Sequence, residues 1–215
     1  MAHILITSGP TRQYLDPVRY LTNASSGRMG VALAEAALAA GHQVTIVSGP
    51  VAVNYPAAAR VVDVVSTEDM LAASAEIFPA CQGLIGVAAP CDYRPELVAS
   101  QKIQKTGEPL VLYLHETPDV VATLGSQKAP SQWVVGFALE TEDARFRAIV
   151  KAEKKHCDMI VLNGPEAMHA AQTRVEVLTH HGESAGTFEG SKESAAREIF
   201  RVINQRLVQP REVQP

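Results

Sequence analysis

The chain has 215 residues, of which 47% are hydrophobic and 20% charged, as in a globular protein with a substantial core. Its formal net charge of −4 gives no reason to expect nucleic-acid binding. No apolar run approaches the roughly 18 residues that a membrane helix needs, and no signal-peptide pattern opens the sequence. The three cysteines, at positions 81, 91 and 157, lack metal-site spacing and fit a reducing compartment. We therefore expect a cytoplasmic protein without nucleic-acid or membrane partners.

The first part of the chain predicts a strand, a loop and a helix. Residues 3–7 form a β-branched apolar run that is typical of a buried strand in a parallel sheet. A polar loop is expected from Ser8 to about Ser25. The alanine-rich segment 26–41 then predicts a helix, and Gly41 is suited to the position just after its end.

The next segment predicts two strands and a helix. Residues 43–50 and 59–66 are apolar, β-branched runs, and the first of them stops at a Gly-Pro pair. Residues 66–78 predict a helix, because Ser66 and Asp69 have the spacing of a capping box at its first turn.

A polar segment interrupts the alternation in the middle of the chain. Residues 83–90 predict a fourth buried strand, and residues 91–109 are irregular and polar. The alternating residues 110–115 predict an added strand. Residues 117–127 predict a short helix with Pro118 at its start.

The remaining sequence continues the pattern of strands and helices. In order, it predicts strands at 132–139 and 158–163 around a helix at 141–156, a strand pair at 173–182 and 185–190, and a final helix at 191–207. This order indicates an α/β protein with a doubly wound, mostly parallel, Rossmann-like sheet, to which a flap and a late strand pair are added. We expect a single domain over residues 1–208 and a frayed tail at 209–215.

Ligands of such sheets bind beyond the carboxyl ends of the strands, and the segment 19–30, "RYLTNASSGRMG", lies between the first strand and the first helix. If Ser25 or Ser26 caps that helix, the N–H groups of residues 27–30 point outward and suit a phosphate. The other interpretation is an ordinary capped core helix. No glycine fingerprint follows the strand directly, which disfavours an NAD(P)-dependent oxidoreductase.

Three residues near other strand ends each have a functional and a structural interpretation. Asn23 carries a donor and an acceptor for a ligand, or ties its own loop. Asp92 can accept a hydrogen bond from a base or a ribose hydroxyl, or belongs to a turn. Phe137 can stack on a base, or completes the core.

Two groups of lysines also have both a functional and a structural interpretation. Residues 101–105, "QKIQK", can close over a polyphosphate as a lid, or form a solvated loop. Lys151 and Lys155 are four positions apart and share a helix face, where they can bind an anion or simply face solvent. No set of His, Cys, Asp and Glu has zinc spacing, and no nucleophile signature is present.

Taken together, these segments resemble a known family. The opening "ILITSGPTRQYLDPVRYLTNASSGRMGVALAEAALAAGHQVTIVSGPV" is followed in order by "DYRP", "QKIQK", "TPDVV", "VVGFALET", "KAEKKHCDMIVLN" and "VEVL". This arrangement closely resembles the phosphopantothenate–cysteine ligase (phosphopantothenoylcysteine synthetase) family of coenzyme A biosynthesis, over roughly residues 3–163. The resemblance implies a homodimeric α/β fold.

The resemblance also implies a reaction. The carboxylate of 4′-phosphopantothenate is activated by CTP or ATP with Mg²⁺, pyrophosphate leaves, and the amine of L-cysteine displaces the nucleotide from the acyl-nucleotidylate. Many bacterial members carry a flavin-binding decarboxylase before the ligase. Since this sequence starts at the first ligase strand, we expect no bound flavin.

The roles that the resemblance implies fall into three groups. Asn23 and the flap residue Lys102 are expected to be catalytic. The nucleotide is expected to contact Gly86, Val87, Ala88, Asp92, Pro118, Phe137, Lys151 and Lys155. The substrate phosphate or its loop is expected at Ser25, Ser26, Gly27, Arg28, Met29 and Gly30.

The sequence departs from the usual family pattern at several positions. Pro10, Arg28, Pro90, Cys91, Gln104 and Thr117 replace customary residues, and the stretch after Asn163 lacks the family's G-F-x-x-D-x-N pattern. These departures leave an alternative open, a non-catalytic nucleotide-binding homologue with an altered nucleotide loop.

Overall fold

The computed structural model describes residues 1–140, 142–164 and 172–209. A central sheet has the strand order β12-β11-β10-β9-β6-β1-β4-β5. The six strands from β10 to β5 are parallel, and β11 and β12 extend the sheet in antiparallel pairing. Their bounds are β1 His3–Ser8, β4 Gln43–Ser48, β5 Arg60–Asp63, β6 Gly83–Gly86, β9 Trp133–Leu139, β10 Met159–Asn163, β11 Gln172–Thr179 and β12 Ser184–Ser191.

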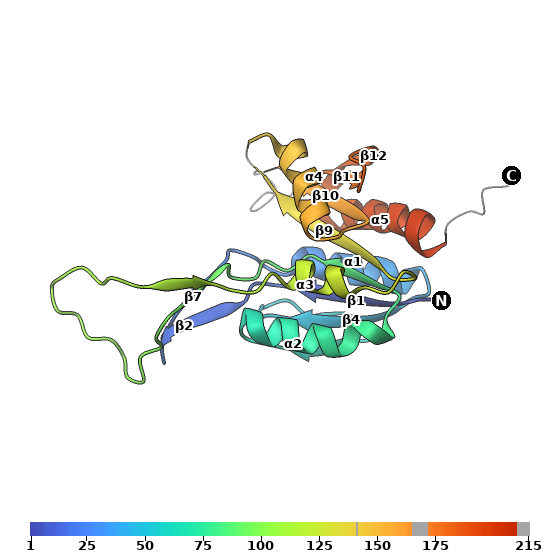
Figure 1. Cartoon of the computed structure of the whole chain (residues 1–215). Coiled ribbons are helices and arrows are strands. Elements are labelled where there is room, and N and C mark those ends of the chain that lie inside the picture. The colour runs from blue at the N-terminus through green and yellow to red at the C-terminus, as the bar shows by residue number, and fades with distance from the viewer. Residues whose placement is uncertain (141, 165–171, 210–215) are drawn as a thin grey trace, which may run out of the picture.

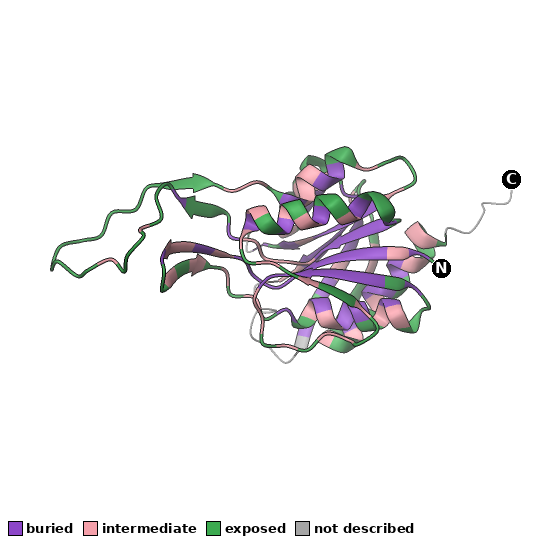
Figure 2. Ribbon diagram, turned by 90° about the horizontal axis from the view of Figure 1, so that it is seen from below, coloured by how far each residue is buried: buried purple, intermediate pink, exposed green. Residues whose placement is uncertain are grey.

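Helices cover both faces of the sheet, and the burial of alternate strand residues explains how (Figure 2). On β1, Ile4 and Ile6 pack in the core cluster beneath α1 (Arg28–Ala39) and α5 (Lys192–Ile203), whereas Leu5 packs in the cluster on the opposite face. That opposite face is covered by α2 (Thr67–Ile77), α3 (Val120–Gln127) and α4 (Ala144–Lys154). The predicted doubly wound α/β fold is confirmed.

Most of the predicted elements are present close to their expected bounds. The capping box of α2 is confirmed, because the backbone N–H of Asp69 donates to Ser66 Oγ at 3.0 Å and that of Ser66 donates to Asp69 Oδ2 at 2.9 Å. Gly41 follows α1 with a φ of +82° and donates to the carbonyl of Leu38, as predicted. A short 3-10 turn, Phe78–Ala80, follows α2, and a π-helical turn, Asn204–Val208, extends α5. Of the predicted frayed tail, residues 210–215 lie outside the described residues.

The expected loop from Ser8 to Ser25 contains a β-hairpin that the sequence did not predict. Its strands are β2 (Arg12–Asp16) and β3 (Arg19–Thr22). Tyr14 and Tyr20 meet across the hairpin in an edge-to-face pair with ring centroids 5.3 Å apart. The hairpin lacks an alternating apolar pattern, because cross-strand aromatic pairing rather than core burial supports it.

The predicted bounds of the strand at 110–115 are wrong. The structure has a short strand β8, Leu114–Glu116, paired with β7, Tyr93–Pro95, and the chain between them extends far from the sheet (Figure 1). We refer to residues 93–116 as the arm. Beyond β8, the alternating residues of the arm do not form a strand, because no described strand lies beside them.

Asp16 anchors the arm to the hairpin. Its Oδ1 accepts hydrogen bonds from the backbone N–H groups of Val18 (2.9 Å) and Arg19 (2.8 Å), and its Oδ2 accepts one from Ile103 (3.2 Å). The guanidinium of Arg19 pairs with Asp16 and also donates to the carbonyl of Ile103. Burial alone would raise the pKa of Asp16, but these donors and the Arg19 charge together lower it.

No helix within residues 1–140, 142–164 and 172–209 is long and apolar enough to cross a bilayer.

Candidate functional site

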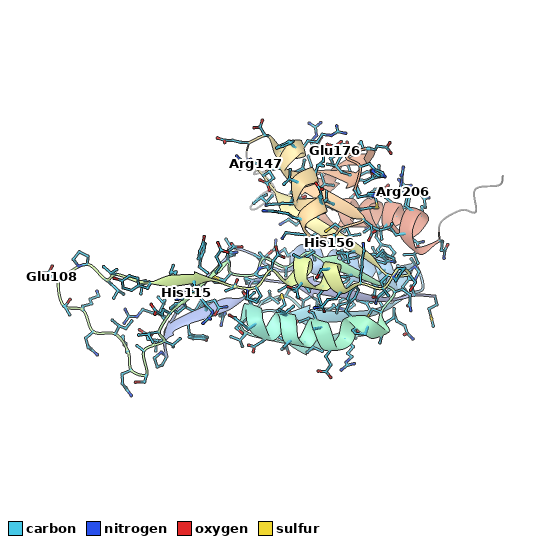
Figure 3. All side chains as sticks on the ribbon, in the orientation of Figure 1. Glu108, His115, Arg147, His156, Glu176 and Arg206 are labelled. Carbon is cyan, nitrogen blue, oxygen red and sulfur yellow. The ribbon has the colours of Figure 1, made fainter. Side chains whose placement is uncertain are left out.

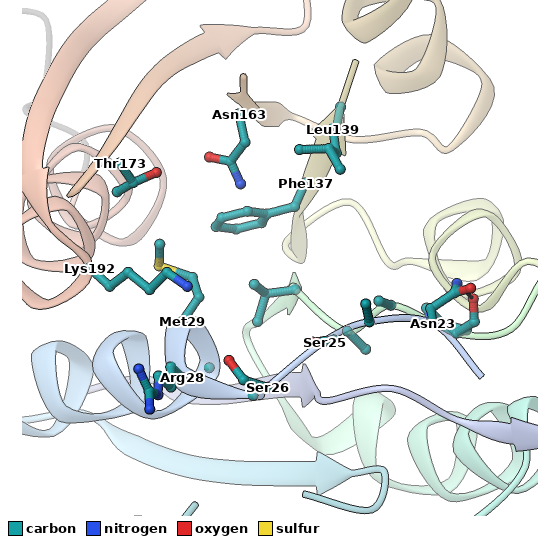
Figure 4. A pocket seen from close by; sticks show the side chains of 18 of the residues that line it. Asn23, Ser25, Ser26, Arg28, Met29, Phe137, Leu139, Asn163, Thr173 and Lys192 are labelled. Atoms are coloured by element: carbon teal, nitrogen blue, oxygen red, sulfur yellow. Dashed lines mark hydrogen bonds between the residues drawn. The ribbon is translucent and has the colours of Figure 1, made fainter. Parts of the chain in front are cut away.

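A pocket of about 460 Å³ lies at the carboxyl edge of the parallel strands (Figure 4). It is lined by the segment entering α1, the loop after β6, the end of β9, one lysine of α4, and residues of β10, β11 and α5. Of the predicted site residues, it contains Asn23, Ser25, Ser26, Gly27, Arg28, Met29, Gly30, Val87, Ala88, Asp92, Phe137 and Lys151.

The start of α1 forms one wall, and its geometry corrects a prediction. Neither Ser25 nor Ser26 caps the helix, because the capping position is Gly27, with a φ of +74° and no side-chain hydrogen bond. A Cβ at Gly30 would lie 2.0 Å from Ser8 Oγ, so only glycine lets the helix approach β1 this closely. The first backbone bond of the helix is from Val31 to Gly27, which leaves the N–H groups of residues 28–30 without helical acceptors.

Asn23 is fixed by the main chain of the loop after β6. Its Nδ2 donates to the carbonyl oxygen of Pro90 at 2.8 Å. An amide nitrogen has two N–H groups, so this bond sets the orientation of Asn23 and leaves a second donor. The residue lies at one end of the pocket in Figure 4.

Three threonines hold the loop that carries Pro90. The N–H of Cys91 donates to Thr11 Oγ1 at 2.7 Å, and the carbonyl of Cys91 accepts from Thr67 Oγ1 at 3.1 Å and Thr117 Oγ1 at 2.6 Å. Thr11 directly precedes β2, Thr67 is the first residue of α2, and Thr117 lies in the segment before α3, so the loop is tied to three parts of the fold. Thr117, one of the departures from the family pattern, therefore has a defined structural role.

Phe137 and Lys151 approach the pocket from β9 and α4. Phe137 is half-buried and presents its ring to the cavity in Figure 4. Lys151 Nζ lies 2.5 Å from Glu140 Oε1, and the side chain of Glu140 is only 8% exposed. The sequence did not single out Glu140, although it lies in the quoted "VVGFALET" motif at the end of β9.

Four predicted site residues lie outside this pocket. Gly86 packs against α3, where an added Cβ would lie 2.4 Å from Val121 Cγ2. Pro118 precedes α3 instead of starting it, because Asp119 is the capping residue. Lys155 Nζ pairs with Asp119 Oδ2 at 3.0 Å. Lys151 of α4 and Lys155, which follows the helix, thus face different carboxylates.

Lys102 is the fourth of these residues and lies on the arm. It is exposed, and it adjoins Ile103, which Asp16 and Arg19 hold against the hairpin. In Figure 3, Glu108 lies at the far end of the arm and His115 lies nearer to the sheet. The structure therefore places Lys102 outside the pocket that contains Asn23 and Lys151.

The pocket also contains residues that sequence reasoning missed. Asn163, Thr173 and Lys192 line it from the end of β10, from β11 and from the first position of α5. Asn163 ends a parallel strand, which is a usable signal for a site residue. Thr173 and Lys192 belong to antiparallel or helical elements that carry no such signal.

The side chains around the pocket decide how a metal ion could be held there. Across the described residues, no three His, Cys, Asp or Glu side chains are grouped as a metal site, and Asp92 is the carboxylate among the pocket residues. That set fits a Mg²⁺ ion held mainly by phosphate oxygens and water.

Burial raises the pKa of Cys81 to about 11 and that of Cys157 to about 12, and it also raises the pKa of Cys91. These thiols are therefore protonated at neutral pH.

A mostly parallel sheet with helices on both faces and a pocket at its carboxyl edge defines a Rossmann-like α/β protein. Within this class, the chain belongs to the family described as the DNA/pantothenate metabolism flavoprotein C-terminal domain, whose model matches residues 1–207.

Curated relatives and solved structures agree with this family. The chain is 37% identical over 204 residues to the coenzyme A biosynthesis bifunctional protein CoaBC of Haemophilus influenzae, covering 94% of this chain and 51% of that protein. It is 40% identical to a cysteine/cysteine sulfinic acid decarboxylase of an unknown prokaryotic organism, covering 93% of this chain and 57% of the relative. The chain thus spans about half the length of these relatives.

Among solved structures, a crystal structure of the C-terminal domain of a CoaBC protein matches with a TM-score of 0.79 and 38% identity. The match covers 94% of this chain and 93% of that domain. The shared architecture therefore extends over almost the whole chain.

Proposed function

We propose that the chain is a phosphopantothenate–cysteine ligase of coenzyme A biosynthesis, which joins 4′-phosphopantothenate to L-cysteine at the expense of CTP or ATP. The observation that carries this proposal is the shared pocket of Asn23, the start of α1, Phe137 and Lys151. These residues come from separate segments of the sequence, and each matches a position for which the resemblance implies a role in this reaction.

The nucleotide is assigned to the side of the pocket formed by β6, β9 and α4. Phe137 offers a ring face on which a base stacks, and the exposed carboxylate of Asp92 accepts from a ribose hydroxyl. Lys151 is positive but already faces Glu140 at 2.5 Å, so binding an anion requires it to share or exchange this partner. Mg²⁺, when bound, neutralises phosphate charge.

In the first step, a carboxylate oxygen of the acid attacks the α-phosphorus. The bond from this phosphorus to the bridging oxygen breaks, and pyrophosphate leaves with the electron pair. The N–H groups of residues 28–30, which line the pocket, lie at the positive end of α1, where they would stabilise negative charge. Positioning and electrostatic stabilisation supply most of the catalysis in transfers of this kind.

In the second step, the cysteine amine attacks the acyl carbon, the bond from this carbon to the phosphate oxygen breaks, and the nucleoside monophosphate leaves with the electron pair while the amine loses a proton to water. Negative charge develops on the acyl oxygen as the tetrahedral intermediate forms. One N–H of Asn23 is committed to the carbonyl of Pro90, so we assign its second N–H to the acyl oxygen. A donor fixed in advance in this way stabilises the transition state without further reorganisation.

The arm supports a homodimer as the working form of the protein. Of the sixteen large hydrophobic residues that are exposed in the described parts of the chain, eight lie on the arm, and Leu97, Val111 and Tyr113 are 83%, 69% and 73% exposed. A second copy of the chain would cover them. Lys102, the expected flap lysine, then acts at a pocket only if the arm moves or reaches the partner's pocket.

We also propose a cytoplasmic location. The CoaBC relatives are named for coenzyme A biosynthesis, and the proposed reaction consumes a nucleoside triphosphate, which the cytoplasm would supply. The free, buried state of Cys81, Cys91 and Cys157 fits the same reducing environment.

A pyrophosphate-release assay tests the proposed function. Release is expected only when 4′-phosphopantothenate is present together with Mg²⁺ and CTP or ATP, and formation of the cysteine adduct is expected only after L-cysteine is added. The panel compares CTP, ATP and UTP, which also identifies the preferred nucleotide. Lack of pyrophosphate release with all of them would reject the ligase activity.

The alternative, a non-catalytic nucleotide-binding homologue, rests on the departures after β6 and β10. The altered stretch after Asn163, residues 164–178, falls in part on residues 165–171, which lie outside the described residues. The Pro90 departure preserves the contact with Asn23, because that contact uses a backbone carbonyl. Nucleotide binding without turnover, unchanged in Asn23→Asp, would favour this alternative.

A further inference from the structure

The segment that follows β4 packs against the start of α1. Val51, Val53 and Tyr55 are half-buried and alternate with exposed residues. A Cβ added to Gly27, the capping residue of α1, would lie 2.9 Å from Val51 Cγ1 and 3.3 Å from Val53 Cγ2. The Tyr55 hydroxyl would lie 3.4 Å from the same Cβ. These side chains therefore surround the cap, although they are outside the set of residues that line the pocket.

The Tyr55 hydroxyl lies between the ends of two strands. Ser8 and Ser48 are the last residues of β1 and β4, are paired in the parallel register, and are buried. Tyr55 Oη lies 2.9 Å from Ser8 Oγ and 2.8 Å from Ser48 Oγ. Ser8 Oγ in turn donates to the carbonyl oxygen of Gly27 at 3.4 Å. The hydroxyl thus links both strands to the cap of α1.

The number of protons fixes the direction of these hydrogen bonds. Each hydroxyl has one proton to donate and two lone pairs to accept with. Because Ser8 gives its proton to the carbonyl of Gly27, the proton between Ser8 and Tyr55 comes from Tyr55. Ser48 donates to Tyr55 Oη or to the carbonyl of Gly49, each at 2.8 Å. The bonds therefore lead from Tyr55 through Ser8 to the first carbonyl of the helix.

The carbonyl of Gly27 determines how α1 begins. It also accepts the first backbone bond of the helix, from the N–H of Val31 at 3.1 Å. The capping position offers no side-chain hydrogen bond of its own, so the first turn depends on neighbouring groups to hold it. The N–H groups of residues 28–30 follow this carbonyl directly, and their orientation depends on the peptide that Ser8 and Tyr55 hold.

We propose that Tyr55 is a positioning residue for the first step of the reaction, an inference that rests on the proposed ligase function. Through Ser8, its hydroxyl holds the carbonyl of Gly27 and thereby fixes the N–H groups of residues 28–30. These groups are assigned to the negative charge that develops as pyrophosphate leaves. Donors that are fixed in advance stabilise such charge without reorganisation. Tyr55 acts from outside the pocket.

Amide hydrogen exchange, followed by NMR on the ligand-free full chain, tests the hold on the cap. Tyr55→Phe removes the hydroxyl and keeps the ring. Exchange at Val31, whose N–H bonds to the carbonyl of Gly27, should become roughly 3- to 10-fold faster, as for the loss of one hydrogen bond. Exchange at Ala37, a buried residue further along α1, should not change. A general loss of stability would accelerate exchange at both residues.

Rapid-mixing kinetics with 4′-phosphopantothenate, Mg²⁺ and the preferred nucleotide separate the two steps. In Tyr55→Phe, kcat for pyrophosphate release should fall by roughly 3- to 10-fold, while KM for the nucleotide stays within about twofold of wild type. This split is expected because a donor that acts mainly in the transition state lowers kcat and not binding. Addition of cysteine to the preformed acyl-nucleotidylate should keep its rate.

Two further variants serve as control and as a test of the path. Tyr14→Phe makes the same chemical change on the hairpin, keeps the aromatic pair with Tyr20, and lies outside the pocket, so it should match wild type. Ser8→Ala interrupts the same series of bonds. The double variant Ser8→Ala/Tyr55→Phe should therefore release pyrophosphate no more slowly than Ser8→Ala alone, since the two residues act through one path.

Other outcomes would overturn the role of Tyr55. Unchanged exchange at Val31, equal acceleration at Val31 and Ala37, or additive losses in the double variant each contradict it. The same holds if Tyr55→Phe releases pyrophosphate at the wild-type rate or slows only the addition of cysteine. A wild-type protein that releases no pyrophosphate rejects the ligase activity and the step assigned to Tyr55, whereas a selective change at Val31 still supports its hold on the cap.

Discussion

The pocket and the arm are built in opposite ways. Around the pocket, the loop at Pro90 and Cys91 is tied by buried or partly buried hydrogen bonds to three threonines and to Asn23. The arm has mostly exposed residues, a two-stranded base, and its anchor at Asp16. The geometry of the pocket is therefore set within one chain, whereas the arm lacks tertiary support over most of its length.

The difference indicates where each region gets its stability. Complete burial of one large apolar side chain contributes about 1.5–3 kcal/mol. The arm exposes eight such side chains, so docking against a second copy would stabilise it considerably, while the pocket needs no partner to keep its shape. Four experiments can break or sharpen this contrast.

The largest effect is expected at Asn23. Asn23→Asp removes both N–H donors and places a carboxylate beside the carbonyl of Pro90, so kcat for the cysteine adduct should fall by about 10²–10³-fold. Quenched-flow measurement of both steps should show that the second step is lost. Asn54→Asp, an exposed loop substitution, is the control. Full activity of Asn23→Asp would remove Asn23 from the reaction.

A mixing experiment tests whether the arm serves a neighbouring pocket. Lys102→Gln and Asn23→Asp protomers are each expected to be inactive as pure proteins. After co-refolding, mixed dimers should regain activity, because one protomer then supplies an intact arm and the other an intact pocket. No recovery, despite mixed dimers seen by native mass spectrometry, would assign Lys102 to the pocket of its own chain.

A substitution at Gly30 probes the rigidity of the pocket wall. Gly30→Ala places a Cβ 2.0 Å from Ser8 Oγ, and overpacking of this kind costs about 1–3 kcal/mol. The melting temperature should fall by roughly 2–4 °C per kcal/mol for a chain of this size. Gly164→Ala, whose Cβ meets no atom of the described residues within 4 Å, should leave it unchanged. Equal melting temperatures for both variants would show that the wall adapts.

The smallest effect concerns the anchor of the arm. Asp16→Asn weakens the bonds to Ile103 and Arg19, so it should lower the melting temperature at neutral pH. Because the pKa of Asp16 is lowered in the folded state, its stabilisation is complete above the ordinary value of 3.8 and is lost as pH falls through the folded-state pKa. The difference between wild type and variant should therefore shrink in acid. A difference that grows in acid would contradict the lowered pKa.

The sequence predicted the sheet well because buried strands leave a strong apolar pattern. Runs such as those at Ile4 and Ile160 are apolar on both faces, and the helices between them carry capping residues such as Ser66. The hairpin at Tyr14 and Tyr20 escaped prediction because it is only partly buried. The cap at Gly27 was missed because it uses backbone conformation and no side-chain oxygen.

The site was predictable only in part, for a related reason. Asn23 and Asp92 lie in loops after strands, Phe137 lies near the end of β9, and the family pattern marks all three. Lys155 matches that pattern equally well, yet it pairs with Asp119, which no spacing reveals. Thr173 and Lys192 become neighbours of the pocket only when β11 folds back beside β10.

The hydrogen bond from Asn23 to Pro90 has an evolutionary consequence. Its acceptor is a peptide oxygen, which every amino acid provides, proline included. Residue 90 can therefore diverge among homologues while Asn23 keeps its aim, as long as the chain traces the same path. An alignment that scores residue identity would rate this position as unimportant, although its backbone orients the residue proposed to act in acyl transfer.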